Sequence, residues 1–169
     1  FVTGPTGCIG AATLAWLLDH GADRVVGFSR TSDRSRIDDS YRDRISLIEG
    51  DITDAASVRD AVTSANPDRI IHLAAFQTPD CQAHPFQGME INVHGTNYLF
   101  QAAAKAGSHL KRFVFASSAA VYGPRTMYPG ETVPEDGGLR PPNLYGHWKV
   151  AGEGAAQAFQ METGVDTVS

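Results

Sequence analysis

Cysteine, long apolar runs and basic charge are all scarce in this sequence. Its two cysteines are too few for a disulfide framework and lack the paired spacing of a zinc site. No apolar run approaches the roughly 20 residues that span a bilayer, and no basic-then-apolar signal opens the chain. A net charge of -5 gives no electrostatic reason to expect nucleic acid or an anionic membrane as a partner. These scarcities favour a cytoplasmic protein that acts on small molecules.

Candidate metal ligands and free nucleophiles are also few. His72, His84, His94 and His109 share no tight ligand spacing, so the sequence predicts no metal site. Cys8 lies where a helix N-terminus could activate a thiol, but we expect it to be a small apolar filler.

The chain is long enough for one domain, and both of its ends resemble cuts. It has 169 residues, of which 42% are hydrophobic and 20% charged. Only Phe1 and Val2 remain of an expected first strand, and residues 165–169 resemble a strand that has just begun. We therefore expect residues 1–169 to be a fragment, truncated at both ends, of a longer protein.

Strand-length apolar runs alternate with helical patterns along the chain. The patterns predict strands at 24–28, 45–49, 69–73 and 112–116, and helices at 8–20, 54–64, 89–106 and 144–162. A loop rich in glycine and proline at 123–142 suggests a substrate-facing segment. This alternation implies right-handed crossovers and a parallel sheet covered on both faces, so the predicted fold class is doubly wound α/β.

A glycine-rich turn between the strand remnant and the first helix is the central motif. In the segment Thr3–Gly10, Gly4 permits a tight turn, Gly7 lets backbone N–H groups approach a pyrophosphate, and Gly10 lets the helix pack closely. The spacing is G-x-x-G-x-x-G, and such a turn also closes purely structural connections. Its position after a strand and before a helix favours dinucleotide binding and a Rossmann-type sheet.

Six motifs in order resemble the short-chain dehydrogenase/reductase superfamily, and within it the extended NAD(P)-dependent epimerase/dehydratase family. They are Thr3–Gly10, Gly50–Asp54, His72–Ala75, Asn92–Thr96, Ser117–Gly123 and Tyr145–Lys149. The resemblance implies an NAD(P)-binding domain at 1–169, with the C-terminal substrate-binding part absent. It also implies a sugar or nucleotide-sugar substrate, and a homodimer formed through the long helix and the last one.

The resemblance places a set of residues around the dinucleotide. Asp51 stands where the family's acid accepts a hydrogen bond from the adenine amino group, although it could equally be a turn or helix-capping carboxylate. Asn92 matches a helix residue that holds the backbone of the site in place. The cofactor-binding residues expected are Gly4, Thr6, Gly7, Cys8, Ile9, Gly10, Ser29, Arg30, Asp51, Ile52, Leu73, Ala74, Ala75, Asn92, Tyr145 and Lys149.

The end of the second strand bears on the choice between NAD and NADP. An NAD site offers an acid there for the ribose 2′-hydroxyl, whereas this chain has Ser29 and Arg30. A guanidinium at Arg30, with Arg34 or Arg36, suits a 2′-phosphate. The alternative is a solvated loop of mixed charge, with NAD as the cofactor. We expect NADP.

A tyrosine, a lysine and a serine form the expected catalytic group. Tyr145 and Lys149 are four residues apart on a predicted helix, which places them on one face, 27 residues after Ser118. A free phenol keeps its proton at neutral pH, but a nearby ammonium favours the phenolate. In the resemblance Lys149 also bonds the nicotinamide ribose, and Ser118, rather than Ser117, steadies the substrate oxygen.

These residues support several reactions. Tyr145 would exchange the hydroxyl proton while the carbinol hydrogen moves as a hydride to or from the nicotinamide. Related 4,6-dehydratases carry an Asp-Glu pair just after the serine, where this chain has Ala119 and Ala120, so dehydration is disfavoured. A sugar epimerase or dehydrogenase, a reductase of a non-nucleotide substrate, and a non-catalytic dinucleotide sensor stay open.

Overall fold

In the part of the chain that the structure describes, six parallel strands form a single twisted sheet. The computed structural model covers residues 1–169 and describes all of them except 129, 131 and 134–137. The strand order is β3-β2-β1-β4-β5-β6, and every neighbouring pair is parallel. The strands are β1 (Val2–Thr3), β2 (Val25–Ser29), β3 (Ile45–Glu49), β4 (Arg69–His72), β5 (Arg112–Phe115) and β6 (Asp166–Val168). The doubly wound parallel sheet predicted from the sequence is confirmed.

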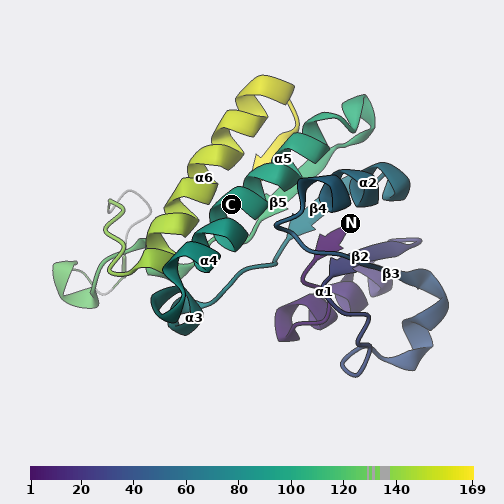
Figure 1. The fold of residues 1–169 in the computed structure, drawn as a ribbon, viewed down its shortest axis with the longest axis horizontal. Helices are drawn as coiled ribbons and strands as arrows, with labels where there is room; N and C mark the ends of the chain where they lie inside the picture. The colour runs from purple at the N-terminus through teal and green to yellow at the C-terminus, as the bar shows by residue number, and fades with distance from the viewer. Residues whose placement is uncertain (129, 131, 134–137) are drawn as a thin grey trace.

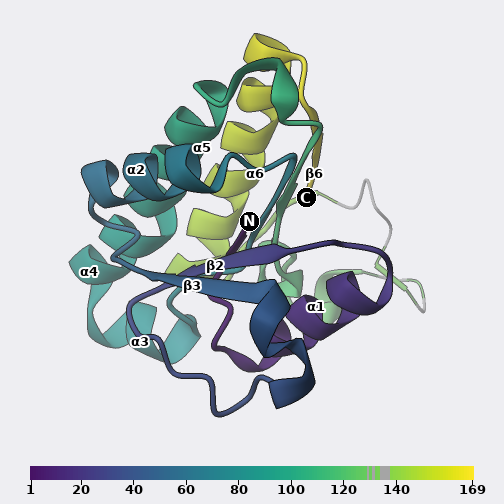
Figure 2. The ribbon, with the colours of Figure 1, turned by 90° about the vertical axis from the view of Figure 1, so that its right-hand side faces the viewer.

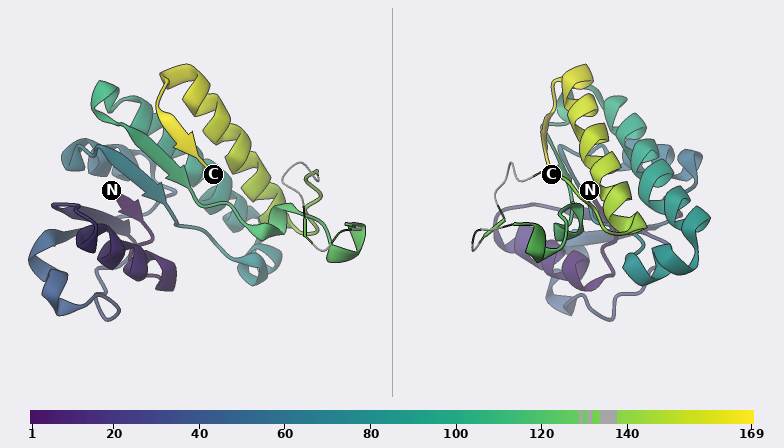
Figure 3. Two further views of the ribbon diagram at one scale, coloured as in Figure 1. Left: turned by 180° about the vertical axis from the view of Figure 1, so that it is seen from behind. Right: turned by 90° about the vertical axis from the view of Figure 1, so that its left-hand side faces the viewer.

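Helices cover the sheet from both sides (Figures 1 and 2). They are α1 (Cys8–Asp19), α2 (Ala55–Ala65), α3 (Thr78–Ala83), α4 (Pro85–Met89), α5 (Thr96–Ala104) and α6 (Leu144–Thr163). Helix α1 lies on one face, whereas α2, α5 and α6 lie side by side on the other (Figure 3). Short 3-10 turns occupy 39–44, 107–109, 119–121 and 125–127.

Two hydrophobic clusters, one on each side of the sheet, hold these layers together. In β4, Ile70 packs into the cluster beneath α2, α5 and α6, and the next residue, Ile71, packs into the cluster beneath α1. This alternation is the period-two pattern of a strand buried on both faces. The larger cluster contains Phe100, Phe113 and Phe159, whose rings lie 4.5–5.5 Å apart.

Helix ends are set by short polar side chains and by left-handed residues. Asp54 caps α2 by accepting hydrogen bonds from the N–H groups of Ala56 and Ser57. Asn66 closes the same helix at a φ of 41°, directly before Pro67. Asn143 caps α6 by accepting from Gly146, and Gly164 ends it at a φ of 73°.

The long helix expected at 89–106 differs from the prediction. The helical segment begins at Pro85, and a π-helical turn at Glu90–Gly95 separates α4 from α5. The preceding α3 was not predicted. Proline stands in the first turn of both α3 and α4, where its missing N–H breaks no helical bond.

The chain reverses its winding between β1 and β4. From β1 it passes through α1 to β2 on one side, and β4 then pairs with the other edge of β1. Ligands of such sheets bind in the crevice outside the carboxyl ends of the strands at this point. The topology therefore directs attention to the residues that follow β1 and β4.

Candidate active site

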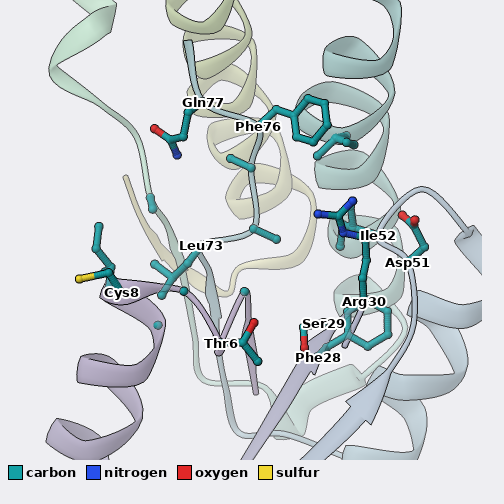
Figure 4. Close-up of a pocket in the computed structure, with 18 of the residues that line it drawn as sticks. Thr6, Cys8, Phe28, Ser29, Arg30, Asp51, Ile52, Leu73, Phe76 and Gln77 are labelled. Atoms are coloured by element: carbon teal, nitrogen blue, oxygen red, sulfur yellow. The ribbon is translucent and has the colours of Figure 1, made fainter. Parts of the chain in front are cut away.

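A pocket of about 720 Å³ lies at the carboxyl ends of the parallel strands (Figure 4). The glycine turn after β1 forms one wall, and the segments after β2, β3, β4 and β5 form the others. Helix α6 adds two residues. Its lining consists of Gly4, Thr6, Gly7, Cys8, Ile9, Gly10, Phe28, Ser29, Arg30, Thr31, Gly50, Asp51, Ile52, Leu73, Ala74, Ala75, Phe76, Gln77, Ile91, Ala116, Ser117, Ser118, Tyr145 and Lys149.

All but one of the site residues expected from the sequence line this pocket. The exception is Asn92, which is buried beside it. The side-chain oxygen of Asn92 accepts from the N–H of Phe76 at 2.8 Å, and its nitrogen donates to the Phe76 carbonyl at 3.0 Å. Asn92 therefore acts on the wall of the pocket through Phe76 and not as part of the lining. The π-helical turn carries this side chain, and such turns are frequent at functional sites.

The glycine turn has backbone geometry that only small residues allow. Gly4 has a φ of +70°, and its N–H donates to the carbonyl of Phe28 at 3.0 Å. A Cβ added at Gly10 would lie 2.1 Å from the Gly4 carbonyl oxygen. Gly7, the N-cap of α1, has no side chain to satisfy the N–H groups of the first turn. These N–H groups and the positive end of the helix dipole are suited in their chemistry to an anion.

The first residue of α1 departs from expectation. Cys8 is exposed and lines the pocket, so the prediction that it fills a small apolar space is wrong. Ile9, 71% exposed, stands beside it. Close packing of Gly10 against the turn directs the two preceding side chains outward.

Asp51 has the turn-stabilising role that the sequence offered and also lines the pocket. Its Oδ1 accepts hydrogen bonds from the N–H and the hydroxyl of Thr53, at 2.9 and 2.8 Å, which is a turn-stabilising arrangement. The residue also lines the pocket beside Ile52. One carboxylate oxygen thus stabilises the loop after β3 while the residue lines the pocket.

The arginines after β2 have separate roles. Arg30 is exposed and lines the pocket (Figure 4). Arg34 instead donates to the carbonyl of Ile45 at 3.0 Å, and Arg36 donates to the Thr6 carbonyl at 3.4 Å. Arg42 pairs with Asp39 on the surface. Of these side chains, Arg30 is the one among the lining residues.

Close packing of α6 brings Tyr145 and Lys149 to the pocket. A Cβ added at Gly146 would lie 2.2 Å from the carbonyl oxygen of Ala120, so the start of α6 rests on the turn that follows Ser118. Tyr145 and Lys149 are only 8% and 5% exposed. The Lys149 Nζ lies 5.6 Å from the centre of the Tyr145 ring. The predicted shared face of the two side chains is confirmed.

The Lys149 ammonium is buried and anchored. It donates to the carbonyl of Ala116 at 2.6 Å and lies 4.8 Å from the centre of the Phe115 ring. Burial lowers the pKa of Lys149 from 10.5 to about 8, because desolvation disfavours the charged form. A positive charge held in this way can act strongly on a neighbouring phenol.

Two adjacent serines after β5 are distinguished by their partners. The Ser117 hydroxyl donates to the Glu153 carboxylate on α6. The Ser118 oxygen accepts from the N–H of Ala120 at 3.1 Å, a bond that leaves its hydroxyl hydrogen for another acceptor. Of the two hydroxyl hydrogens, that of Ser117 is therefore engaged with Glu153, whereas that of Ser118 is available to another acceptor.

Sequence reasoning missed eight lining residues and a buried polar chain. The missed lining residues are Phe28, Thr31, Gly50, Phe76, Gln77, Ile91, Ala116 and Ser117. Most of them adjoin predicted residues at strand ends, so the strand boundaries were the available signal. The buried chain joins Thr3, His72 and Thr96, and nothing local in the sequence indicates it.

Other expectations concern regions beyond the pocket. In the loop at 123–142, residues 129, 131 and 134–137 lie outside the described residues, and the described ones do not line the pocket. Over that same described part of the chain, no group of three His, Cys, Asp or Glu side chains could hold a metal. Nor does any helix in it have the length and apolar character to cross a membrane.

Comparison of the sequence with known protein families identifies the family of this chain. The sequence model of the NAD dependent epimerase/dehydratase family matches residues 1–169. The chain belongs to this family.

Relatives in the epimerase/dehydratase family include isomerases and dehydrogenases. UDP-glucose 4-epimerase of Erwinia amylovora is 32% identical over 146 residues, which cover 83% of this chain and 43% of that protein. D-erythronate dehydrogenase of Cupriavidus necator is 29% identical over 161 residues, covering 90% of this chain and 47% of that one. The chain thus spans about half the length of these relatives.

Solved structures of family members have the same fold. UDP-glucose 4-epimerase from Thermus thermophilus, in complex with NAD, matches with a TM-score of 0.86 and 26% identity, over 99% of this chain and 52% of that one. UDP-glucose 4-epimerase from Brucella ovis, also in complex with NAD, matches with a TM-score of 0.83 and 26% identity, over 98% and 49% of the two chains.

Proposed function

We propose that this chain is the dinucleotide-binding part of an enzyme that oxidises, or transiently oxidises, a carbinol of a sugar or nucleotide sugar. The observation that carries the proposal is that Ser118, Tyr145 and Lys149 line the same pocket as the glycine turn. A site that only senses a dinucleotide has no need of a base. The substrate-binding part would lie in the half of the family members that this chain does not cover.

The pocket suits a nicotinamide dinucleotide in its chemistry. The uncapped N–H groups at the start of α1 suit a pyrophosphate, and the close approach of Gly10 to Gly4 keeps side chains from filling that position. Asp51 and Ile52 would hold the adenine end. Leu73, Ala74 and Ala75 would lie along the middle, and Tyr145 and Lys149 at the nicotinamide end.

The residues of the chain would perform the acid-base part of the reaction. When bound, the nicotinamide supplies a hydride acceptor and donor. Tyr145 as phenolate would take the hydroxyl proton of the substrate, and Lys149 would stabilise that phenolate by its charge. Ser118 would donate its free hydroxyl hydrogen to the substrate oxygen and hold it near Tyr145. In the reverse direction Tyr145 would return the proton.

The family relatives support two outcomes of this chemistry. UDP-glucose 4-epimerases and a D-erythronate dehydrogenase are both similar to this chain. Ala119 and Ala120 follow Ser118 where an acid-base pair for eliminating water would be needed, which disfavours dehydration. We favour an epimerase of a nucleotide sugar, with a dehydrogenase as the alternative.

The cofactor proposed is NADP, with NAD as the alternative. Arg30 supports NADP because it is exposed, lines the pocket and directly follows β2. Solved relatives in complex with NAD support the alternative.

The proposal includes a cytoplasmic homodimer. A reducing compartment suits the free, exposed thiol of Cys8. Phe86 on α4 and Met161 near the end of α6 are each 87% exposed, and these separate apolar side chains support a contact between two copies through the long helical segment and α6. Light scattering on the full-length protein tests this part separately.

One experiment distinguishes the reactions. The full-length protein is incubated with a panel of nucleotide sugars and free sugars, and products and reduced nicotinamide are followed together. An isomer formed with no net change in cofactor supports the epimerase, and stoichiometric gain or loss of reduced cofactor supports the dehydrogenase. Absence of both, in protein that binds no dinucleotide, would overturn the proposal.

A further inference from the structure

A chain of buried hydrogen bonds crosses the centre of the molecule behind the pocket. The Thr3 hydroxyl lies 2.7 Å from Nδ1 of His72, whose Nε2 lies 2.9 Å from the Thr96 hydroxyl. Thr96 in turn donates to the carbonyl of Asn92 at 2.8 Å. Thr3, His72 and Thr96 are at most 2% exposed. This series of hydrogen bonds therefore joins β1, β4 and α5, and none of its residues lines the pocket.

Counting donors fixes the direction of the hydrogen bonds between Thr3, His72 and Thr96. The Thr3 side-chain oxygen already accepts two N–H groups, that of Ala74 at 3.1 Å and that of Leu73 at 3.2 Å, and Leu73 shares its N–H with the Thr3 backbone carbonyl at 3.3 Å. A hydroxyl oxygen has two lone pairs, so its own hydrogen must point to Nδ1 of His72. Nδ1 is then unprotonated, and the neutral ring carries its proton on Nε2, which donates to Thr96.

The two N–H groups held by Thr3 belong to the wall of the pocket. Leu73 and Ala74 both line it. A Cβ added at Gly4 would lie 3.1 Å from the nitrogen of Ala74, so the glycine turn rests directly on this strand end. The position of Leu73 and Ala74 thus determines where the turn and the end of β4 meet, at the point where a dinucleotide crosses the sheet.

The same chain reaches the next part of that wall. Asn92, whose carbonyl receives the Thr96 hydroxyl, uses its side chain to hold both backbone groups of Phe76. The segment from Leu73 to Phe76 is therefore held at one end through Thr3 and at the other through Asn92. His72 and Thr96 connect Thr3 to Asn92 through hydrogen bonds.

We propose that His72 and Thr96 are positioning residues for the dinucleotide site, acting through Thr3. The ring, kept in the Nε2–H tautomer by Thr96, takes the Thr3 hydroxyl hydrogen and leaves both lone pairs of that oxygen for Leu73 and Ala74. If Thr96 cannot accept, the other tautomer places a third donor on the Thr3 side-chain oxygen. Leu73 keeps a second acceptor in the Thr3 backbone carbonyl, so the N–H of Ala74 is the one whose hydrogen bond is weakened. This inference rests on the proposed function, since it concerns the same cofactor.

The test compares variants that touch no cofactor in the full-length protein. Thr96→Val removes the acceptor and keeps the shape, and Thr96→Ser restores the hydroxyl. Val62→Ala, in the core beneath α2, is a control that lowers stability away from the pocket. The dissociation constants of NADH and NADPH are measured by fluorescence, with thermal unfolding on the same samples.

We expect Thr96→Val to weaken dinucleotide binding by about tenfold. Thr96→Ser and Val62→Ala are expected to bind within about twofold of the wild type, although Val62→Ala unfolds at a lower temperature. Unchanged binding by Thr96→Val, or equal weakening by Val62→Ala, would overturn the inference and leave the proposed function intact. A wild type that binds no dinucleotide would instead overturn the proposed function.

A spectroscopic measurement keeps the inference testable if Thr96→Val does not fold. Nitrogen NMR of the wild-type histidine rings reports which nitrogen carries the proton. The inference requires a His72 ring with Nε2 protonated and Nδ1 bare. A ring protonated on Nδ1 would overturn it.

Discussion

The ammonium of Lys149 is bonded to the carbonyl of Ala116, 33 residues earlier, at 2.6 Å. This bond joins α6 to the carboxyl end of β5 and holds a charged group in a place where it is only 5% exposed. Burying an ammonium costs free energy, and one neutral hydrogen bond does not offset all of it. Lys149 therefore opposes folding at neutral pH while it serves the proposed chemistry.

Replacing Lys149 is expected to stabilise the cofactor-free protein and abolish its activity. The unfolded lysine keeps its proton up to about pH 10.5 and the folded one only to about pH 8, so the free energy of unfolding rises with pH between these values. The total rise from this group is about 3 kcal/mol. Lys149→Met should remove this rise. At pH 7 its free energy of unfolding should exceed that of the wild type by about 2 kcal/mol, because the avoided cost of burying the charge outweighs the lost bond to Ala116. Denaturant unfolding at pH 7 and 9.5 measures the difference in stability and its change with pH. Lys105→Met, which replaces an exposed lysine, is the control.

Loss of the Tyr145 hydroxyl is expected to lower kcat by a factor of at least about 100 and to leave dinucleotide binding nearly unchanged, since the phenol acts in proton transfer. Steady-state kinetics and a fluorescence titration of Tyr145→Phe separate the two effects. Tyr41→Phe removes a phenol bonded to Asp19, away from the pocket, and should retain full turnover. If Tyr145→Phe kept most of its activity, another group would be the acid-base residue.

Removing the guanidinium of Arg30 is expected to weaken NADPH binding by about tenfold or more and to change NADH binding little, because only NADPH carries the 2′-phosphate. The control is Arg42→Ala, whose partner is Asp39 on the surface. Titrations of both cofactors against both variants give the selectivity. Equal affinities of Arg30→Ala and wild type for NADPH would favour NAD as the cofactor.

Acid is expected to destabilise the fold through His72. Burial, with a further contribution from the charge of Lys149, lowers the pKa of His72 from 6.5 to about 3. Between these values the unfolded chain binds the proton and the folded one does not, so stability falls as the pH falls through this window. The loss at pH 5 is about 2 kcal/mol. The free energies of unfolding of the wild type and of His72→Asn should approach each other as the pH falls. His109→Asn, which replaces an exposed histidine, should show the same pH dependence as the wild type.

The parts of the fold that follow local rules were predictable from the sequence. Apolar runs of strand length and helical patterns between them indicated the alternation of strands and helices. The glycine turn and the four-residue spacing of Tyr145 and Lys149 then identified the pocket. These signals lie within short stretches of chain, where spacing alone determines which residues share a face.

The parts that depend on distant contacts were not predictable. Thr3 and His72 are 69 residues apart, and no local pattern relates them. The π-helical turn was also missed, because the apolar spacing on either side of it resembles that of an ordinary helix. Exposure of Cys8 depends on how tightly Gly10 packs against Gly4, which is a tertiary property.

The wide turn at Glu90–Gly95 implies that the length of this helix, as well as its composition, is functionally constrained. A π-helical turn holds one residue more than the α-helical turn it replaces. Deleting one residue just after Asn92 would let the bonding become regular, and would rotate Asn92 by roughly 100° relative to α5. The helix would gain regularity, but the hold on Phe76 would be lost. Single-residue deletions should therefore impair the protein most strongly in this segment, although Ile91 is its only residue that lines the pocket. Substitutions would not reveal this constraint, because they leave the length of the helix unchanged.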